Sequence, residues 1–259
     1  MPSSPIHRTS VTLPDASAAP AYFASISEVV LQIERAKDTS SIINYLREVI
    51  HRIGAEVGTF VSCIEDDEYR TCRFLLACDP RWYSEYERRA WSSDDPWLQY
   101  CRRHAEPIRA SEIPARNETQ VSIVRLAEQY DFRSAVVVPA PVGGGLTRLG
   151  MLCLGSADPQ RFEGEAFVFV KVAALPVAAA LNRWCTERAR EELLQSKNLA
   201  PEDLVLLDLQ RQGMTTKQMV RLTNMSAKSI NSRFQRINAK LRVRTRKAAA
   251  RRAAEYGLI

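Results

Sequence analysis

The spacing of hydrophobic positions changes several times along the first two hundred residues, and each change predicts an element. Apolar residues at helical spacing over residues 25–52 predict one or two amphipathic helices. Shorter helices are predicted over residues 80–89 and 121–130. A long helix is predicted over residues 162–196, with Pro176 interrupting it or marking the join of two helices.

Four short runs rich in β-branched and aromatic residues predict strands, at residues 59–64, 71–76, 134–139 and 149–155. The acidic segment 65–68 and the glycines 143–145 separate them in pairs, which predicts two hairpins. Helices, antiparallel strands and a long closing helix predict an α/β/α sandwich with a mainly antiparallel sheet.

Residues 199–259 carry a different pattern, typical of a helix-turn-helix. Ser226 is a natural N-cap, and after it Ile230, Phe234, Ile237 and Leu241 form one apolar stripe at helical period. The chain is therefore expected to have an α+β two-domain organisation. Its C-terminal domain is expected to be all-α.

The same segment is strongly basic. It carries a net charge of +9 while the whole chain carries +6, so the other 198 residues carry −3. The opposite face of the predicted second helix holds Lys228, Asn231, Ser232 and Gln235, near the end where such helices meet base edges. Asn and Gln suit paired hydrogen bonds to adenine. The expected contacts to phosphate and neighbouring DNA atoms are Lys217, Arg233, Arg236, Arg244, Arg246 and Lys247. The alternative is a helical bundle with a solvated basic face.

Residues 78–110 concentrate aromatic side chains around carboxylates. Trp82 and Tyr86 are four residues apart and would share one face of a helix, close in sequence to Asp95 and Trp97. These are ingredients of a small-molecule pocket, although such a pair is more often core packing. The six cysteines form no CxxC pair, so reduced core thiols are expected in place of a disulfide scaffold or a metal site.

We expect a flexible arm over residues 1–20, a ligand-binding and dimerisation domain over 21–195, a linker over 196–198 and a DNA-binding domain over 199–259. The first twenty residues lack the apolar segment of a signal peptide, and no apolar run approaches the length of a membrane span. A cytoplasmic protein without a membrane partner is expected.

The C-terminal segment resembles the LuxR-type helix-turn-helix through to its final Gly-Leu-Ile. The resemblance implies a four-helix DNA-binding domain that works as a dimer, with Asn231 and Gln235 at base-reading positions. Asp203 stands where Glu is usual, and Arg242 stands where a small turn residue is common. The matching residues are Leu199, Pro201, Asp203, Leu207, Gly213, Lys217, Met219, Val220, Leu222, Ser226, Ser229, Ile230, Ile237, Lys240, Leu241, Val243, Arg246, Ala249, Gly257, Leu258 and Ile259.

Residues 25–185 resemble the acyl-homoserine-lactone-binding domain of the same family. The resemblance implies that Trp82 donates to a lactone carbonyl, that Asp95 accepts from the ligand amide and that Tyr86 lines the acyl chain. Cys153 stands where Ser or Thr commonly contacts the acyl carbonyl. The residues that carry the resemblance are Trp82, Tyr86, Asp95, Pro96, Pro107, Ala127, Pro139 and Gly150.

Four positions depart from the family pattern. Cys78 and Ala110 replace large aromatic residues, and Asp131 and Ala135 replace glycines. Two lost aromatic rings leave space for a bulkier, aryl-bearing ligand, or for Trp91 or Trp97 to turn inward and fill the site.

The leading hypothesis is a ligand-responsive, homodimeric transcriptional regulator that binds a palindromic operator. Its signal would be an acyl- or aryl-homoserine lactone, and it needs no other cofactor. RNA polymerase would be a partner if the protein activates; repression uses the same parts. The alternatives are a ligand-independent regulator whose N-terminal domain only dimerises, and a lactone- or amide-processing enzyme fused to a DNA-binding module. No nucleophile elbow or paired His/Asp set supports the enzyme, and a response-regulator body lacks the required strand pattern.

Overall fold

The computed structural model describes residues 19–65, 70–140 and 148–259 of the chain. These divide into two compact units. The first holds the described parts of Met1–Val61, Arg73–Pro141 and Leu149–Asn182, and the second holds those of Ser62–Cys72, Val142–Arg148 and Arg183–Ile259.

A five-stranded sheet with the order β2-β1-β5-β4-β3 forms the centre of the N-terminal part. Its long strands are β1 (Val57–Glu65), β2 (Arg70–Ala77), β4 (Ser134–Ala140) and β5 (Arg148–Ser156), all at predicted positions. β4 and β5 are antiparallel, with Val137 opposite Cys153. The edge strand β3 (Ile108–Arg109) was not predicted, and it pairs with β4 at only two positions. The predicted Gly143–Gly145 turn and most of the acidic turn lie outside the described residues.

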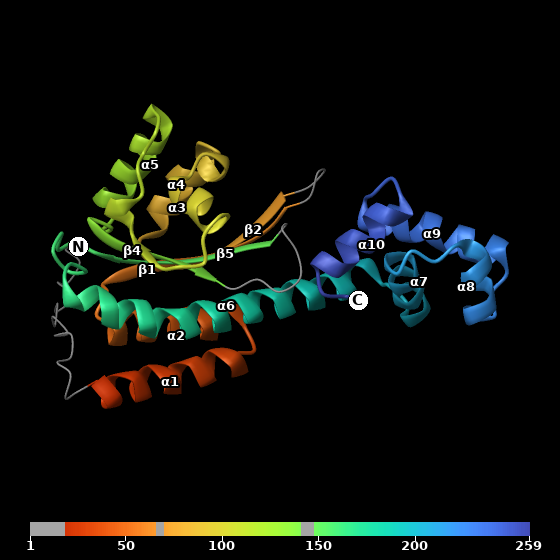
Figure 1. The fold of residues 1–259 in the computed structure, drawn as a ribbon, viewed down its shortest axis with the longest axis horizontal. Coiled ribbons are helices and arrows are strands. Elements are labelled where there is room, and N and C mark those ends of the chain that lie inside the picture. Colours follow the sequence, from red (N-terminus) through yellow and green to blue (C-terminus); the bar gives the residue numbers. More distant parts are fainter. Residues whose placement is uncertain (1–18, 66–69, 141–147) are drawn as a thin grey trace, which may run out of the picture. The chain divides into compact units, whose positions relative to one another are not determined.

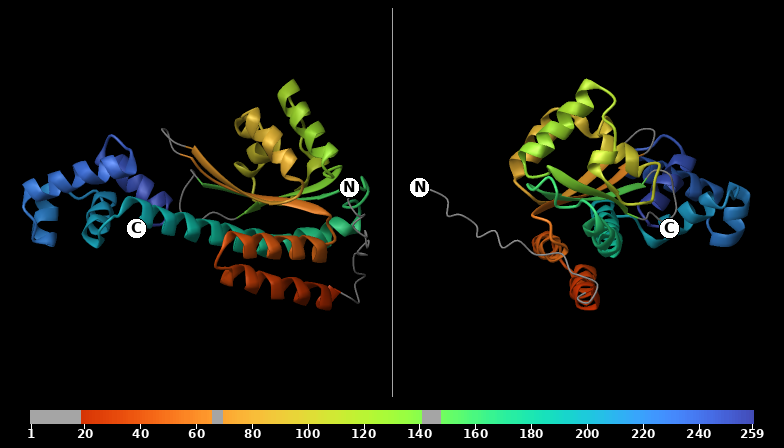
Figure 2. Two further views of the ribbon diagram at one scale, coloured as in Figure 1. Left: turned by 180° about the vertical axis from the view of Figure 1, so that it is seen from behind. Right: turned by 60° about the vertical axis from the view of Figure 1, so that its left-hand side comes forward.

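Helices cover both faces of this sheet (Figures 1 and 2). One face carries α2 (Thr39–Ile53) and α6 (Glu165–Lys197), and α1 (Ala19–Arg35) packs on α2. Two glycines of the sheet let α2 and α6 pack closely against it. A Cβ atom added at Gly58 would overlap Ile50 of α2, and one added at Gly150 would overlap Asn182 of α6. The other face carries α3 (Pro80–Arg88), α4 (Pro96–Cys101) and α5 (Glu118–Gln129). The predicted α/β/α sandwich is confirmed.

The local sequence sets the ends of the first helices. Asp38 caps α2 by accepting from the Ser41 amide, and Gly54 ends the helix in the left-handed conformation at φ 89°. The region predicted as one or two helices therefore forms two. Ala19 already lies in α1, so residues 19 and 20 are helical and do not belong to a flexible arm.

Helix α6 is continuous through Pro176 for 33 residues, so the predicted interruption was wrong. Pro176 lies at an exposed position. Its missing amide removes one hydrogen bond from the helix ladder on that side. The sequence had suggested no apolar run long enough for a membrane. Within Glu165–Gln195, however, α6 is long and apolar enough to cross one by length and composition, and 44% of that apolar stretch is buried in the protein.

The C-terminal unit contains α7 (Pro201–Arg211), α8 (Thr216–Thr223), α9 (Ala227–Leu241) and α10 (Arg246–Glu255). The predicted stripe is confirmed, since Ile230, Phe234, Ile237 and Leu241 are all buried in one core. Leu193 and Leu194 of α6 pack against this core, and α6 extends to Lys197. The predicted linker, residues 196–198, is therefore helical at its first two positions.

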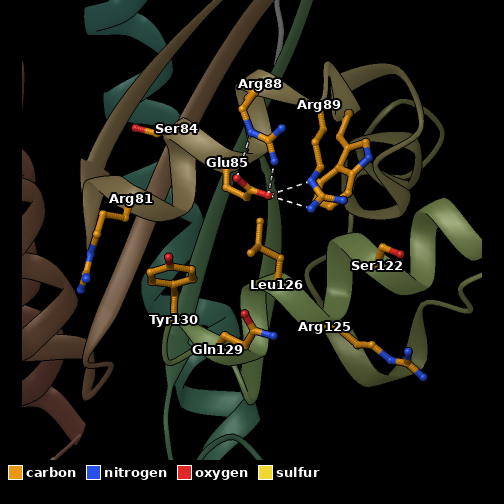
Figure 3. A pocket seen from close by; sticks show the side chains of 11 residues that line it. Arg81, Ser84, Glu85, Arg88, Arg89, Ser122, Arg125, Leu126, Gln129 and Tyr130 are labelled. Atoms are coloured by element: carbon orange, nitrogen blue, oxygen red, sulfur yellow. Dashed lines mark hydrogen bonds and ion pairs between the residues drawn. The ribbon is translucent and has the colours of Figure 1, made fainter.

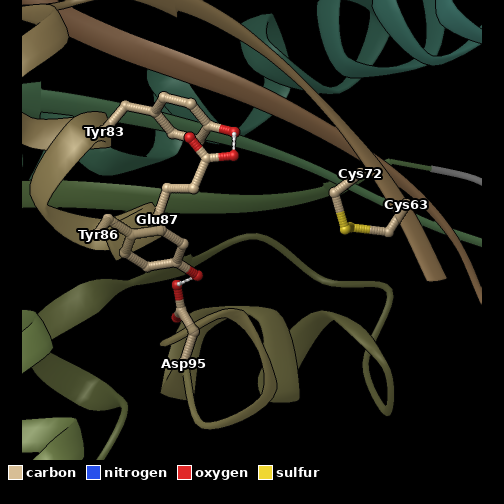
Figure 4. Close-up of a disulfide and its surroundings, with 6 residues drawn as sticks. All are labelled: Cys63, Cys72, Tyr83, Tyr86, Glu87 and Asp95. Carbon is tan, nitrogen blue, oxygen red and sulfur yellow. Dashed lines mark hydrogen bonds between the residues drawn. A yellow bond between two sulfur atoms is a disulfide. The ribbon is translucent and has the colours of Figure 1, made fainter. Parts of the chain in front are cut away.

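Cys63 and Cys72 form a disulfide between β1 and β2, with 4.1 Å between their Cα atoms (Figure 4). The expectation that all six cysteines are reduced thiols was wrong for this pair. Adjacent antiparallel strands bring directly opposite residues to such a distance. The remaining cysteines, Cys78, Cys101, Cys153 and Cys185, are free.

Candidate functional sites

Helix α3 presents Trp82 and Tyr86 from one face toward the sheet. Asp79 caps the helix by accepting from the Arg81 amide, and Pro80 at the first helical position has the backbone angle that a helix start needs. With the start fixed, the spacing of four residues brings both rings to the same side. They stack with centroids 5.3 Å apart, and both residues are buried.

Asp95 lies beside this pair and begins α4. One carboxylate oxygen accepts from the amides of Trp97 and Leu98, at 2.8 and 3.2 Å, which makes Asp95 the helix N-cap. The other oxygen accepts from the Tyr86 hydroxyl at 2.8 Å (Figure 4). Asp95 is 3% exposed. The three predicted residues Trp82, Tyr86 and Asp95 therefore meet in one buried cluster, although nothing in the structure tests their role in binding.

Phe132 joins Trp97 to the same cluster. Its ring centroid lies 5.9 Å from that of Trp82 and 6.4 Å from that of Trp97. The indole Nε1 of Trp97 is buried and has no acceptor among the described residues. A buried N–H without an acceptor costs about 1–3 kcal/mol, so this donor is a point at which an added acceptor would bind favourably. Sequence reasoning missed Phe132, which directly follows Asp131, one of the noted departures.

Three free thiols lie around the cluster. Burial, the charge of Asp95 and the nearby Cys101 and Cys78 thiols all raise the pKa of Cys153 well above the usual thiol range. Burial, together with the Asp79 charge, raises the pKa of Cys78 to about 12. These thiols are therefore neutral near pH 7 and can act only as weak donors. In the described part of the chain, no group of three His, Cys, Asp or Glu side chains could hold a metal ion.

The remaining predicted residues lie at the margins of the cluster. Ala110 is half-buried at the start of η2 (Ala110–Glu112), directly after edge strand β3. Trp91 begins η1 (Trp91–Ser93), is 9% exposed, and meets Tyr86 edge to face at 6.4 Å. Both Trp91 and Trp97 are thus turned inward, as one of the two sequence interpretations expected.

An open groove of about 580 Å³ lies between α3 and α5, outside the cluster (Figure 3). Glu85 pairs with both Arg88 and Arg89, and the Arg89 guanidinium lies 4.9 Å from the centre of the Trp91 ring. Because its arginines are exposed and three of them, Arg81, Arg88 and Arg89, are already paired, the groove has the character of an ordinary solvated surface.

The predicted helix-turn-helix comprises α8 and α9. Thr215 and Gln218 form a reciprocal cap at the start of α8, with the Thr215 amide donating to Gln218 Oε1 at 2.8 Å. Ser226 caps α9 by accepting from the Ser229 amide, as predicted. Arg242 ends α9 in the left-handed conformation at φ 53°, which explains why small residues are favoured there.

The polar face of α9 is open to solvent, but two of the predicted DNA-contacting arginines are half-buried and bond to other protein groups. Arg233 is half-buried and pairs with the buried Asp203 of α7 at 2.8 Å. Arg246 is half-buried and contacts Asn231, Thr216 and Phe234. The exposed members of the predicted set are Lys217, Lys228, Asn231, Ser232, Gln235, Arg236, Arg244 and Lys247.

The autoinducer binding domain family matches residues 38–183, which is more than half of the chain. The chain belongs to the autoinducer-binding domain family. Domains of this family bind small signal molecules, and the matched range contains the whole aromatic cluster. No curated protein sequence matches the chain.

The fold extends this likeness beyond the autoinducer-binding domain. The crystal structure of Escherichia coli SdiA is similar at a TM-score of 0.69 and 14% identity, over 92% of this chain and 99% of SdiA. SdiA in complex with octanoyl-rac-glycerol is similar at 0.65 and 12% identity, over 92% and 96% of the two chains. CepR2 from Burkholderia cenocepacia, an N-acylhomoserine-lactone-dependent LuxR family transcription factor, is similar at 0.50 and 12% identity, over 65% and 98%.

With the family match, these similarities confirm the predicted membership of the LuxR family. They also agree with the expectation of a regulator that is not an enzyme.

Proposed function

We propose that the chain is a homodimeric transcriptional regulator that binds a palindromic DNA operator in response to a homoserine lactone bearing an acyl or aryl group. The ligand would lie beside the aromatic cluster, with Trp82, Tyr86, Asp95, Trp97 and Cys153 around it and Cys78 and Ala110 at its margins. The protein would act in the cytoplasm, and an activator of this kind would also contact RNA polymerase.

The observation that carries the ligand proposal is the buried Trp97 Nε1 without an acceptor, inside the domain that the family matches. A lactone or amide carbonyl is an acceptor of the required kind. Asp95 adds carboxylate lone pairs that can accept from a ligand amide. An apolar wall with a few convergent polar groups is typical of small-molecule sites.

A ligand-independent regulator is the second candidate, and a specific observation favours it. Trp91 and Trp97 are both turned inward, and the stacked Trp82 and Tyr86 rings complete a packed interior. If these rings keep their places in solution, the N-terminal domain would serve dimerisation only.

A thermal melt of the full-length protein against alkanoyl and aryl homoserine lactones separates the two candidates. A ligand at about 100 times its dissociation constant stabilises the folded state by about 2.7 kcal/mol, which raises the melting temperature measurably. Trp97→Phe keeps an aromatic ring but removes the indole N–H together with part of the ring system, and it should weaken binding of the active lactone about tenfold. Trp91→Phe is the matched control, and it should leave the affinity nearly unchanged. No shift with any lactone, in protein that binds DNA, would favour the ligand-independent candidate.

The DNA-binding proposal is supported by the exposed polar face of α9 and by the net charge of +9 on residues 199–259. Positive side chains around a recognition helix attract the phosphate backbone, while exposed amides suit base edges. Selection of bound duplexes from a random library tests it: an enriched palindrome is expected, and recovery of unbiased sequences would contradict it.

The dimer proposal is supported by an apolar face on α6. Val168 and Val172 are four residues apart and 60% and 53% exposed, with the partly buried Leu175 and Ala179 continuing the line. Such a stripe is buried favourably against a second copy. Val168→Glu with Val172→Glu should convert a dimer to a monomer in light scattering. Leu31→Glu, which changes an exposed apolar side chain of α1, should leave the dimer intact. A wild-type monomer at all concentrations would refute the proposal.

A further inference from the structure

The side chain of Arg246 connects three helices of the C-terminal unit. Arg246 is the first residue of α10, and its Nη2 donates to Asn231 Oδ1 of α9 at 2.7 Å. Its Nη1 donates to Thr216 Oγ1 of α8 at 3.2 Å, and its guanidinium lies 4.5 Å from the centre of the Phe234 ring. Two hydrogen bonds and a ring contact therefore hold this guanidinium in one position, unlike that of the exposed Arg244.

This contact fixes the orientation of the Asn231 amide. A guanidinium group has only donors, so the atom of Asn231 that it meets must be the carbonyl oxygen. The amide group at the other end then points away from Arg246, with two N–H donors still free. Asn231 is exposed, so those donors are open to a ligand.

We propose that Arg246 is a positioning residue for DNA specificity, which presents Asn231 to the major groove as a hydrogen-bond donor. This inference rests on the proposed DNA binding. Paired recognition of adenine would need Asn231 Oδ1 turned to the base, whereas here that oxygen is turned to Arg246. Guanine offers two acceptors, O6 and N7, on its major-groove edge. The neighbouring guanidinium charge also favours an acceptor-rich edge. The amide of Asn231 is therefore expected to select guanine over adenine.

The test compares the same conservative substitution at two arginines, in the full-length protein. Arg246→Lys keeps the positive charge, but a single ammonium group cannot bond Asn231 and Thr216 in the same planar arrangement. Arg221→Lys makes the same change at an exposed side chain of α8, outside the network and outside the predicted set of DNA contacts. Duplexes are first selected with the wild-type protein. The base pair contacted by Asn231 is then identified as the position at which Asn231→Ala removes the protein's preference for one base.

At that base pair the wild-type protein should prefer guanine, and Arg246→Lys should reduce the preference roughly tenfold. Arg221→Lys should leave the preference for guanine unchanged. Affinity for non-specific DNA and its dependence on salt should be the same in both variants, since both keep their charge. In the Asn231→Ala background, adding Arg246→Lys should cause no further loss of base preference at this position. Thr216→Val, which removes the other anchor of the guanidinium, should reduce the preference in the same direction.

Equal preferences in Arg246→Lys and Arg221→Lys would overturn the inference, and so would a wild-type preference for adenine at this base pair. If the wild-type protein enriches no sequence at all, the proposed DNA binding fails together with the inference. An enriched palindrome with a silent Arg246→Lys would overturn the inference alone. Retained non-specific binding shows that each variant is folded, so a loss of preference has a local cause.

Discussion

The Asp95 carboxylate accepts from the Tyr86 hydroxyl and from the Trp97 and Leu98 amides, so its replacement is expected to affect stability as well as ligand binding. Asp95→Ala removes the N-cap of α4, which costs about 1 kcal/mol. It also leaves the buried Tyr86 hydroxyl without its acceptor, which costs a further ~1–3 kcal/mol. The free energy of unfolding should therefore fall by about 2–4 kcal/mol, before any ligand is added.

Urea denaturation of the full-length protein, followed by tryptophan fluorescence, measures this loss. Tyr86→Phe removes the hydroxyl and leaves the cap intact, so it should cost less than Asp95→Ala. In the double variant the two losses should not add, because both single changes break the same hydrogen bond. Asp94→Ala changes the exposed neighbour and serves as the control. A loss below 0.5 kcal/mol for Asp95→Ala, or full additivity in the double variant, would refute this account of the site; the threshold is about the error of such comparisons.

Three further predictions follow from other contacts. Arg252→Met should lower the free energy of unfolding by roughly 2–3 kcal/mol, because the buried guanidinium donates to the Leu241 and Arg242 carbonyls at the end of α9. In the same urea titration, Arg236→Met at an exposed site should change the free energy of unfolding little. Gly155→Ala should destabilise the protein by ~1–3 kcal/mol, because its Cβ would overlap the Phe132 ring and lie 2.9 Å from Val57 Cγ2; an unchanged melting temperature would contradict the packing described. The Cys78 thiol has a pKa of about 12 in the folded state and a lower pKa when the chain is unfolded, so the free energy of unfolding should fall as the pH rises above about 9. This group contributes at most ~1.4 kcal/mol per pH unit to the decline. Cys78→Ala should flatten the decline in thermal melts between about pH 8 and 10.5, and a slope identical to that of the wild-type protein would exclude the thiol as its cause.

The sequence was most informative where periodicity and caps agree. Ser226, the apolar stripe of α9 and the strand runs all led to elements at the expected positions. Helix α4 was missed although Asp95 and Pro96 form an N-cap and a first helical residue, because the pair was interpreted only as part of a ligand site. The two residues of β3 are too few for alternation to be visible.

The missed disulfide has a geometric reason. A turn centred on residues 65–68 would place Cys63 opposite residue 70, so no partner cysteine was evident. The structure instead joins Cys63 of β1 to Cys72 of β2. For the site, residue types identified Trp82, Tyr86 and Asp95. The Trp97 donor and the Arg246 contact depend on packing between elements far apart in sequence, which no local pattern encodes.

The short strand β3 also affects how copies of this protein can aggregate. It occupies the outer edge of β4 at Val136 and Val137, and the 3-10 helix η2 follows directly and lies against the same strand. An incoming strand from another molecule therefore finds no long free row of amides and carbonyls there. In the sheet as described, the outer edge of β2 is then the edge at which a strand from another molecule can add. Charged substitutions that suppress misassembly during expression or storage should accordingly be sought along β2, and changes beside β3 should have little effect.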